Sequence, residues 1–360
     1  MEVRIQTLTP LWTGGVQAGK VDRIHETGIL GSMRWWYEAI VRGLGGECCD
    51  PSHTECAFTE EKYLKSQAVD KRQKLHDAGL CDVCQVLGAT GWKRRLRLAI
   101  QDSTRHDPSI EDRLQANRSY VGANGRSRTP IWYFPKELNY KPCSGELSIG
   151  VQSLSNDFDP KVIAGLVQFI ADWAGMGARA QMGFGVVQLA NGRVDTRPLY
   201  NYMQSVAGSH PYFKLPTLQN IFLARILPKD ERQFDEKETF NLKYDLRRLF
   251  ALSVDDTELR HFVMGTTRGT RIAAKVKMSR PYNGGKEMRV WGWIPKELPN
   301  AKNFKNRNDV VQAIHQHLTN NYTVQVWREM DSARDTVVPN NNDVMTFLRT
   351  LLKLEEDRHA

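Results

Sequence analysis

The order in which strand and helix patterns follow one another constrains this fold most, because one order of six elements occurs twice. Strands are predicted where apolar and polar residues alternate, and helices where apolar residues recur at intervals of three and four. Each half of the chain gives a strand, a helix, two strands, a helix and a strand. The strands are predicted at 3–8, 92–101, 146–153 and 186–189 and again at 220–227, 271–278, 288–295 and 324–328, and the helices at 32–43, 160–174, 236–252 and 306–320. A further strand is predicted at 131–134 and is counted with the insertions of the first half.

This order, βαββαβ, is that of the ferredoxin-like, RRM-like fold. We therefore expect an α+β protein with two such domains, and 360 residues leave room for both. Segment 196–218 contains three prolines and is expected to be a linker, and 102–129 a long loop. The first domain is expected at 1–210, with a cysteine-containing insertion at 45–87 and a Gly-rich loop at 175–185, and the second at 211–360.

The chain shows no membrane or export signal. No apolar run approaches the ~18 residues that a membrane helix needs, and the N-terminus lacks the apolar core of a signal peptide. We expect a cytoplasmic protein whose thiols stay reduced.

The predicted insertion holds five of the six cysteines. Cys81 and Cys84 form a Cys-x-x-Cys turn, which is half of a zinc site, and Cys49 and Cys56 are the expected second pair. Cys48 and His53 are spare candidates. A structural Zn²⁺ would stabilise an insertion that is too polar for a core of its own. The alternatives are free thiols and, less favoured because no strand precedes the turn, a redox pair.

The Gly-rich loop lies between a predicted helix and a predicted strand. Four glycines surround Arg179, and exposed backbone N–H groups beside an arginine suit a phosphate. A flexible connector is the alternative interpretation.

Positive charge gathers in two windows of a chain whose net charge is +9. Segment 88–134 has nine Lys or Arg against four Asp or Glu, and segment 261–289 has seven against one. Such clustering predicts a polyanionic partner, and nucleic acid is the favoured one. The less favoured alternative is that both windows are solvated basic strands or loops without a partner. The predicted RNA-binding residues are Arg34, Trp35, Trp92, Lys93, Arg94, Arg95, Arg128, Gly177, Arg179, Gly183, Gly185, Lys243, Arg247, Arg268, Arg271, Lys275 and Lys277.

Two of these assignments have structural alternatives. Trp35 lies off the apolar stripe of its predicted helix, so it can stack on a base or pack under the insertion. The two basic windows occupy equivalent places in the two domains, so they can form one RNA groove, or one of them can face a partner protein.

Four stretches of the chain together resemble the RAMP superfamily of CRISPR effector proteins, with the first-numbered subunits of type III-B (Cmr) complexes as the nearest branch. Val86-Leu87-Gly88 departs conservatively from the usual Leu-Phe-Gly. The four stretches are Leu-Thr-Pro-Leu-Trp-Thr-Gly-Gly at 8–15, Gly-Ser-Met-Arg-Trp-Trp-Tyr-Glu at 31–38, the cysteine turn that leads to Thr-Gly-Trp at 90–92, and the loop that ends in Gly-Phe-Gly at 183–185.

The resemblance implies two ferredoxin-like domains and a subunit without nuclease activity. It further implies binding of guide RNA near its 3′ end, contact with target RNA or the guide–target duplex, and other effector subunits as partners. The alternative is a RAMP endoribonuclease that processes guide precursors, for which His25 is the candidate acid or base. A zinc hydrolase is disfavoured, because a set of four cysteines leaves no open metal position.

Overall fold

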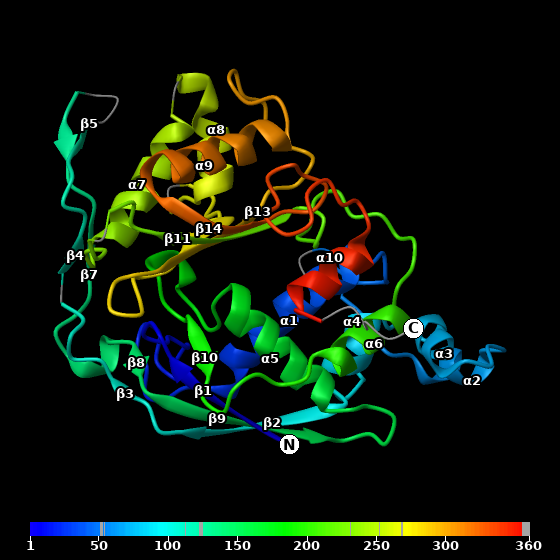
Figure 1. The fold of residues 1–360 in the computed structure, drawn as a ribbon. Coiled ribbons are helices and arrows are strands. Elements are labelled where there is room, and N and C mark those ends of the chain that lie inside the picture. Colours follow the sequence, from blue (N-terminus) through cyan, green and yellow to red (C-terminus); the bar gives the residue numbers. More distant parts are fainter. Residues whose placement is uncertain are drawn as a thin grey trace.

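The structure is a computed structural model that describes residues 1–50, 53, 55–111, 113–121, 125–230, 232–251, 253–267 and 269–354. Within these ranges the chain is a mixed α/β protein with two four-stranded antiparallel sheets, one in each half (Figure 1). No helix in the described ranges is long and apolar enough to cross a membrane.

The first sheet has the strand order β10-β1-β9-β2, and two helices cover one face of it. Alternation of apolar and polar residues produces this: Val3 and Ile5 of β1 are buried toward the helices, whereas Glu2 and Arg4 are exposed. Along the chain the elements are β1 (Glu2–Thr7), α1 (Glu26–Gly43), β2 (Leu96–Asp102), β9 (Glu146–Ser153), α5 (Lys161–Trp173) and β10 (Val187–Leu189).

The second sheet repeats this connectivity, with the strand order β12-β13-β11-β14. Between α7 and β12 the chain adds η3 (Val254–Asp256) and α8 (Thr257–Met264), and α10 (Val344–Leu351) follows the last strand. The repeated elements are β11 (Ile221–Leu227), α7 (Glu238–Leu249), β12 (Val276–Met278), β13 (Met288–Trp293), α9 (Arg307–Asn321) and β14 (Thr323–Arg328).

The two halves are stacked, so that α1 and α5 lie between the sheets and α7 and α9 lie outside the second sheet (Figure 1). Neighbouring residues of β11 show this: Leu223 belongs to the core shared with α1 and α5, and Phe222 to the core under α7 and α9. Arg289 of β13 donates hydrogen bonds of 2.7 and 3.0 Å to the carbonyl oxygens of Ala171 and Ala174, at the end of α5. The inner face of the second sheet is therefore covered by the first half.

The insertion shares the core of the first half. Its helices are α2 (Glu60–Lys65), α3 (Lys71–Asp77) and α4 (Asp82–Leu87). Leu75, Val83 and Val86 are buried in the same cluster as α1 and α5. The insertion thus has an apolar anchor in addition to its cysteines.

The segment expected to be a long loop is instead an arm of paired strands, seen along the left edge of Figure 1. The arm reaches α7 of the second half, where Arg118 pairs with Asp245 and the Tyr120 hydroxyl donates to the Asn241 carbonyl oxygen over 3.2 Å. Its elements are β3 (Arg105–His106), β4 (Arg113–Gln115), β5 (Tyr120–Val121), β6 (Ser127–Arg128), β7 (Ile131–Tyr133), η1 (Leu138–Tyr140) and β8 (Cys143–Ser144).

Three further expectations about the elements are wrong. Helix α1 begins at Glu26, six residues before the predicted start, because tertiary packing overrides the poor helix propensity of its two early glycines. The expected linker contains α6 (Arg197–Ser205), which has a proline in its first turn. The expected strand at 271–278 is regular only from Val276, because the amides of Ile272 and Lys275 donate to the carbonyl oxygens of Thr266 and Val263 and not to a neighbouring strand.

Candidate metal centre and nucleic-acid interface

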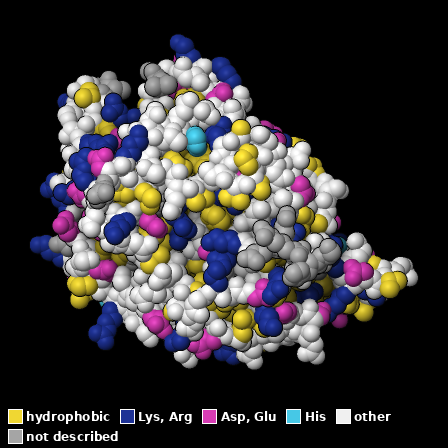
Figure 2. Space-filling view, in the orientation of Figure 1, with side chains coloured by type: hydrophobic (Ala, Val, Ile, Leu, Met, Phe, Trp, Pro, Cys, Tyr) yellow, Lys and Arg dark blue, Asp and Glu magenta, His cyan; other side chains and the backbone are white. Residues whose placement is uncertain are grey.

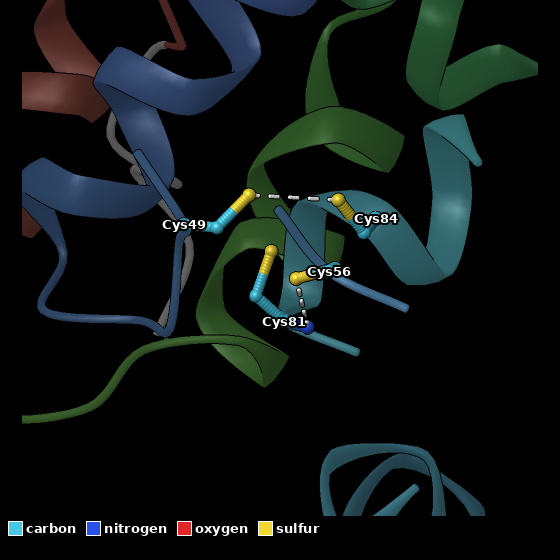
Figure 3. A group of neighbouring side chains, drawn as sticks. All are labelled: Cys49, Cys56, Cys81 and Cys84. Carbon is cyan, nitrogen blue, oxygen red and sulfur yellow. Dashed lines mark hydrogen bonds between the residues drawn. The ribbon is translucent and has the colours of Figure 1, made fainter. Parts of the chain in front are cut away.

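Four cysteine thiols converge where the insertion meets α1. The Sγ atoms of Cys49, Cys56, Cys81 and Cys84 all lie within 4.8 Å of one another, and Figure 3 shows them pointing toward a common centre. The Cys49 and Cys84 sulfurs are 3.7 Å apart. A tetrahedral zinc–thiolate site has sulfurs about 3.8 Å apart, since each Zn–S bond is about 2.3 Å. The four residues therefore fit a metal ion, and they are the four that the sequence predicted.

The environment of Cys81 already favours a thiolate. Hydrogen bonds from the thiols of Cys48, Cys49 and Cys84 hold the pKa of the Cys81 thiol far below its ordinary value. Cys48 is buried beside the cluster but is not one of the four, and the spare candidate His53 is exposed. Hydrogen bonds within the cluster also raise the pKa of Cys49 to about 12 and raise that of Cys84, so one thiolate is favoured and a metal ion must displace protons from the other ligands.

Substitution of one cluster cysteine should abolish stoichiometric metal binding. We expect the purified wild-type chain to hold one metal ion, and Cys84→Ser to lose it and to melt at a lower temperature, because three thiolates leave the centre open. Elemental analysis and thermal melting measure both effects. Cys143→Ser is the matched control, since Cys143 is a buried thiol outside the cluster. Absence of metal from wild-type protein purified without chelator would contradict the prediction.

The Gly-rich loop lies at the junction of the two halves and packs tightly there. Gly177 (φ +82°) and Gly183 (φ +91°) adopt left-handed conformations, and a Cβ atom would lie 2.4 Å from the Trp12 carbonyl oxygen at the first and 2.5 Å from the Arg280 amide nitrogen at the second. The Gly177 amide donates to Ser32 Oγ over 2.8 Å. Ser32 lies inside α1, whose N-cap is His25, so it is not the helix cap that the sequence predicted.

The amides of the other predicted glycines also have acceptors inside the protein. Gly183 donates to the Ala180 carbonyl oxygen and Gly185 to that of Pro10. The backbone of Gly177, Gly183 and Gly185 is thus used for packing, which leaves the side chain of Arg179 as the part of the loop that can bind a ligand.

Four cations are here called the junction cations: Arg179, Lys243, Lys275 and Lys277. Three of them lie on or beside the loop, and Lys275 stands two residues before Lys277, where its Nζ donates to the Phe262 carbonyl oxygen over 3.0 Å. Lys243 reaches the loop directly, since its Nζ donates to the Gln181 carbonyl oxygen over 3.2 Å. Strand β12, which carries Lys277, contacts the loop's 3₁₀ turn η2 (Ala180–Met182). Figure 2 shows Lys and Arg side chains spread over one face of the molecule, interspersed with Asp and Glu side chains.

Each junction cation lies over an aromatic ring. The Arg179 guanidinium carbon is 3.7 Å from the centroid of the Trp12 ring, and the Lys277 ammonium is 5.1 Å from that of Trp35. Lys243 lies 5.2 Å from the Trp132 ring centroid, and Lys275 3.5 Å from that of Phe262. Cations interleaved with aromatic rings are typical of surfaces that bind single-stranded nucleic acid.

The junction cations have no carboxylate partner within the part of the chain that the structure describes. Burial lowers the pKa of Lys275 and of Lys277 to about 8, and burial together with the charge of Arg247 lowers that of Lys243 to about 8. Burial lowers the pKa of Arg179 too. Uncompensated cations with shifted pKa values mark candidate functional sites, and a bound anion would supply the missing negative charge.

The remaining predicted RNA-binding residues are dispersed. Lys93, Arg94 and Arg271 are exposed, as predicted. Arg95 pairs with Asp157, and the Arg247 guanidinium donates to the Gly265 carbonyl oxygen. Arg268 and the side chain of Arg128 lie outside the described residues.

The two tryptophans predicted to bind RNA, Trp35 and Trp92, have different surroundings. Trp92 packs against Phe58 of the insertion, with ring centroids 5.0 Å apart, and its indole N–H donates to the Gln85 carbonyl oxygen. Trp35 packs edge-on against Trp36 and lies under Lys277. Trp92 is therefore used to dock the insertion, and Trp35 is part of the junction.

Sequence reasoning missed two residues of the junction. Trp12 supports Arg179 and packs near the rings of Phe134 and Phe184. Arg280 is buried beside Gly183, pairs with Glu236, and has an Nη1 atom without a hydrogen-bond partner. Trp12 stands in one of the four stretches that resemble the family, and this was the signal that could have identified it.

RNA binding should weaken as pH rises through 8. A phosphate stabilises the charged form of a lysine and raises its pKa, so binding takes up protons near pH 8 and affinity is greatest below that value. We expect affinity for single-stranded RNA to fall several-fold, roughly, from pH 7 to pH 9 at constant salt. Fluorescence anisotropy measures it. Lys277→Arg, which keeps its charge, should flatten the pH profile, and a wild-type profile that is already flat would contradict the prediction.

Comparison with known proteins places the chain in a family. Among solved structures, it is similar to Cmr1 from Pyrococcus furiosus in its apo form (14% identity, TM-score 0.44, covering 88% of this chain and 96% of that one). It is also similar to a chain of the type III-B Cmr-beta complex bound to cognate target RNA and AMPPnP in the presence of ssDNA (11% identity, TM-score 0.42, covering 89% and 98%). A third similar chain is from Cmr-beta bound to cognate target RNA (10% identity, TM-score 0.36, covering 88% and 99%).

No curated protein matches the chain. The family model of the RAMP superfamily matches residues 4–188, which run from β1 to β10 and include the cysteine cluster and the Gly-rich loop. This segment is more than half of the sequence, and the chain belongs to the RAMP superfamily.

Proposed function

We propose that this protein is a non-catalytic RNA-binding subunit of a type III-B CRISPR effector complex, and that it binds guide RNA, towards the 3′ end, and the target RNA beside it. The observation that carries the proposal is the set of four junction cations, each over an aromatic ring and none with a carboxylate partner among the described residues. The family and the sequence stretches that resemble Cmr subunits support the identity of the complex. Other effector subunits are its protein partners, in the cytoplasm.

The proposed architecture is two ferredoxin-like domains. The strand orders β10-β1-β9-β2 and β12-β13-β11-β14, with the same connectivity, support it. We place the first domain at 1–210 and the second at 211–360, because this boundary falls in the chain between α6 and β11.

RNA is proposed to cross the junction as a single strand. Phosphates would contact the junction cations, and bases would stack on rings and on the guanidinium plane of Arg179. Such contacts carry little base information, so recognition is expected to tolerate any sequence, as a guide-binding subunit requires. We further propose that Arg94 and Arg271 extend this path, so that the two basic windows form one groove.

The metal is proposed to be a structural Zn²⁺ held by Cys49, Cys56, Cys81 and Cys84. When bound, it would supply folding free energy by cross-linking the insertion. The cysteines join three segments of chain that approach α1, so they fix the position of the insertion on the first half.

The second candidate is a guide-precursor endoribonuclease, and one contact favours it. His25 Nε2 lies 2.8 Å from Asp22 Oδ1, and a carboxylate in that position can orient a histidine as a general base. His25 stands directly before α1, whose Ser32 contacts the Gly-rich loop.

One assay separates the two functions. Labelled guide RNA and labelled precursor are incubated with the purified protein, and with a His25→Ala variant as the matched control. Retention of intact RNA by both proteins supports the binding subunit. A discrete product that disappears in His25→Ala would replace the proposal with the nuclease.

Arg179 should contribute one phosphate contact. Arg179→Ala is expected to weaken RNA binding and to lower the slope of log affinity against log salt by about one, whereas Arg179→Lys should retain the slope. Arg97→Ala, on the open face of the first sheet, is the control for general loss of charge. A salt slope that is unchanged in folded Arg179→Ala would assign Arg179 to packing on Trp12 or to base stacking.

A further inference from the structure

A ladder of charged side chains on α1 faces the cysteine cluster. Arg34, Glu38 and Arg42 are spaced four residues apart, so they lie on one face of the helix. Arg34 Nε donates to Glu38 Oε1 over 2.9 Å, and Arg42 Nη2 donates to Glu38 Oε2 over 3.1 Å. Glu38 and Arg42 are buried, and the Arg34 side chain is 30% exposed, so the ladder runs from the interior to the edge of the cluster.

Each end of the ladder contacts a segment that carries cluster cysteines. Arg42 Nη2 donates to the Cys49 carbonyl oxygen over 3.1 Å. Arg34 Nη2 lies 3.2 Å from Cys84 Sγ itself, and its Nη1 donates to the Gly88 carbonyl oxygen over 3.2 Å, just beyond the end of α4. The guanidinium of Arg34 thus makes three directed contacts, and one of them is to a sulfur.

The charge of a filled centre explains why a cation belongs here. Four thiolates around a divalent ion carry a net charge of about −2 in a half-buried place, and such a charge needs donors and cations around it. Among the side chains that the structure describes, Arg34 is the cation in contact with a cluster sulfur. Residues of this kind orient metal ligands and tune their affinity.

We propose that Arg34 is a positioning residue of the metal centre, which holds the Cys84 thiolate and thereby the metal, and that it is not an RNA contact. The proposal rests on the proposed metal centre. It replaces the sequence-based assignment of Arg34 to RNA, because all the donor groups named above point into the protein. The neighbouring Trp35 keeps its place at the junction, since it lies under Lys277.

The test compares Arg34→Gln, Arg34→Lys and Arg97→Gln with the wild-type chain. Zinc affinity is measured by competition with a chromophoric chelator, and the thiolate-to-cobalt absorption bands are recorded after Co²⁺ substitution. We expect Arg34→Gln to weaken zinc binding about 10- to 100-fold and to shift the cobalt bands. Arg34→Lys should lose less affinity because it keeps the charge, and Arg97→Gln should match the wild type.

RNA affinity of the zinc-loaded proteins distinguishes the two roles of Arg34. The proposal expects zinc-loaded Arg34→Gln to bind RNA with wild-type affinity and salt slope. Wild-type zinc affinity together with a smaller RNA salt slope would overturn it and return Arg34 to the RNA surface. If Arg34→Gln does not fold, Arg34→Met, which keeps an unbranched side chain and removes its charge, gives the same readings.

Failure of the metal centre itself has a different signature. A wild-type chain that binds neither Zn²⁺ nor Co²⁺ would overturn both the proposed centre and this inference. If the wild-type chain binds metal and both Arg34 variants bind it with the wild-type affinity, only the role of Arg34 is overturned.

Discussion

The arrangement of this molecule depends on how the inner face of the second sheet packs against the helices of the first. Arg289 is the polar anchor of that contact. Its guanidinium donates hydrogen bonds to the carbonyl oxygens of Ala171 and Ala174, at the end of α5, where carbonyl groups have no partner within the helix. Arg225 of β11 makes a similar contact to the Asp172 carbonyl oxygen. A cation at a helix C-terminus is also favoured by the helix dipole. The contact therefore fixes the direction of α5, and with it the start of the Gly-rich loop.

This packing determines which surfaces are open to the proposed RNA ligand. RRM-like domains commonly present aromatic residues on an open sheet face, on which bases stack. Here the inner face of the second sheet is covered, and the outward positions of β1, β2 and β9 in the first sheet carry polar or small residues and no aromatic one. The rings and the cations without a carboxylate partner gather instead at the junction. Trp12 lies under Arg179 of the Gly-rich loop, and two rings of the first half, Trp35 and Trp132, lie under Lys277 and Lys243 of the second half. A surface built from both halves exists only while their relative position is fixed.

The sequence predicted the parts of the fold that have strong local signals. Both sets of six elements form, and α9 starts where it was predicted, with Asn306 as its N-cap. The four cysteines were predicted because a Cys-x-x-Cys turn fixes two ligands locally and few other thiols could complete the set. The early turns of α1 and the pairing of the arm were missed, since the first depends on tertiary packing and the second on contacts with α7, more than 100 residues away in sequence. All four junction cations were among the predicted RNA-binding residues. The ring that each of them contacts could not be predicted, because it depends on the three-dimensional arrangement.

The contrast between paired and unpaired cations is the strongest physical sign that the junction has a role beyond stability. Elsewhere this chain pairs several of its buried or partly buried arginines with carboxylates: Arg328 pairs with Asp335, and Glu329 accepts from both Arg307 and Arg334. Leaving Lys275 and Lys277 without such partners costs folding free energy, which their lowered pKa values express as a weaker hold on the proton in the folded chain than in the unfolded one. A hydrophobic residue at either position would avoid this cost. The rings beneath the lysines offset part of it, but a polyanion offsets more, because it restores the counter-charge that the protein omits. A polyanionic ligand would therefore stabilise the junction, which is the behaviour expected of a binding surface and not of a structural core.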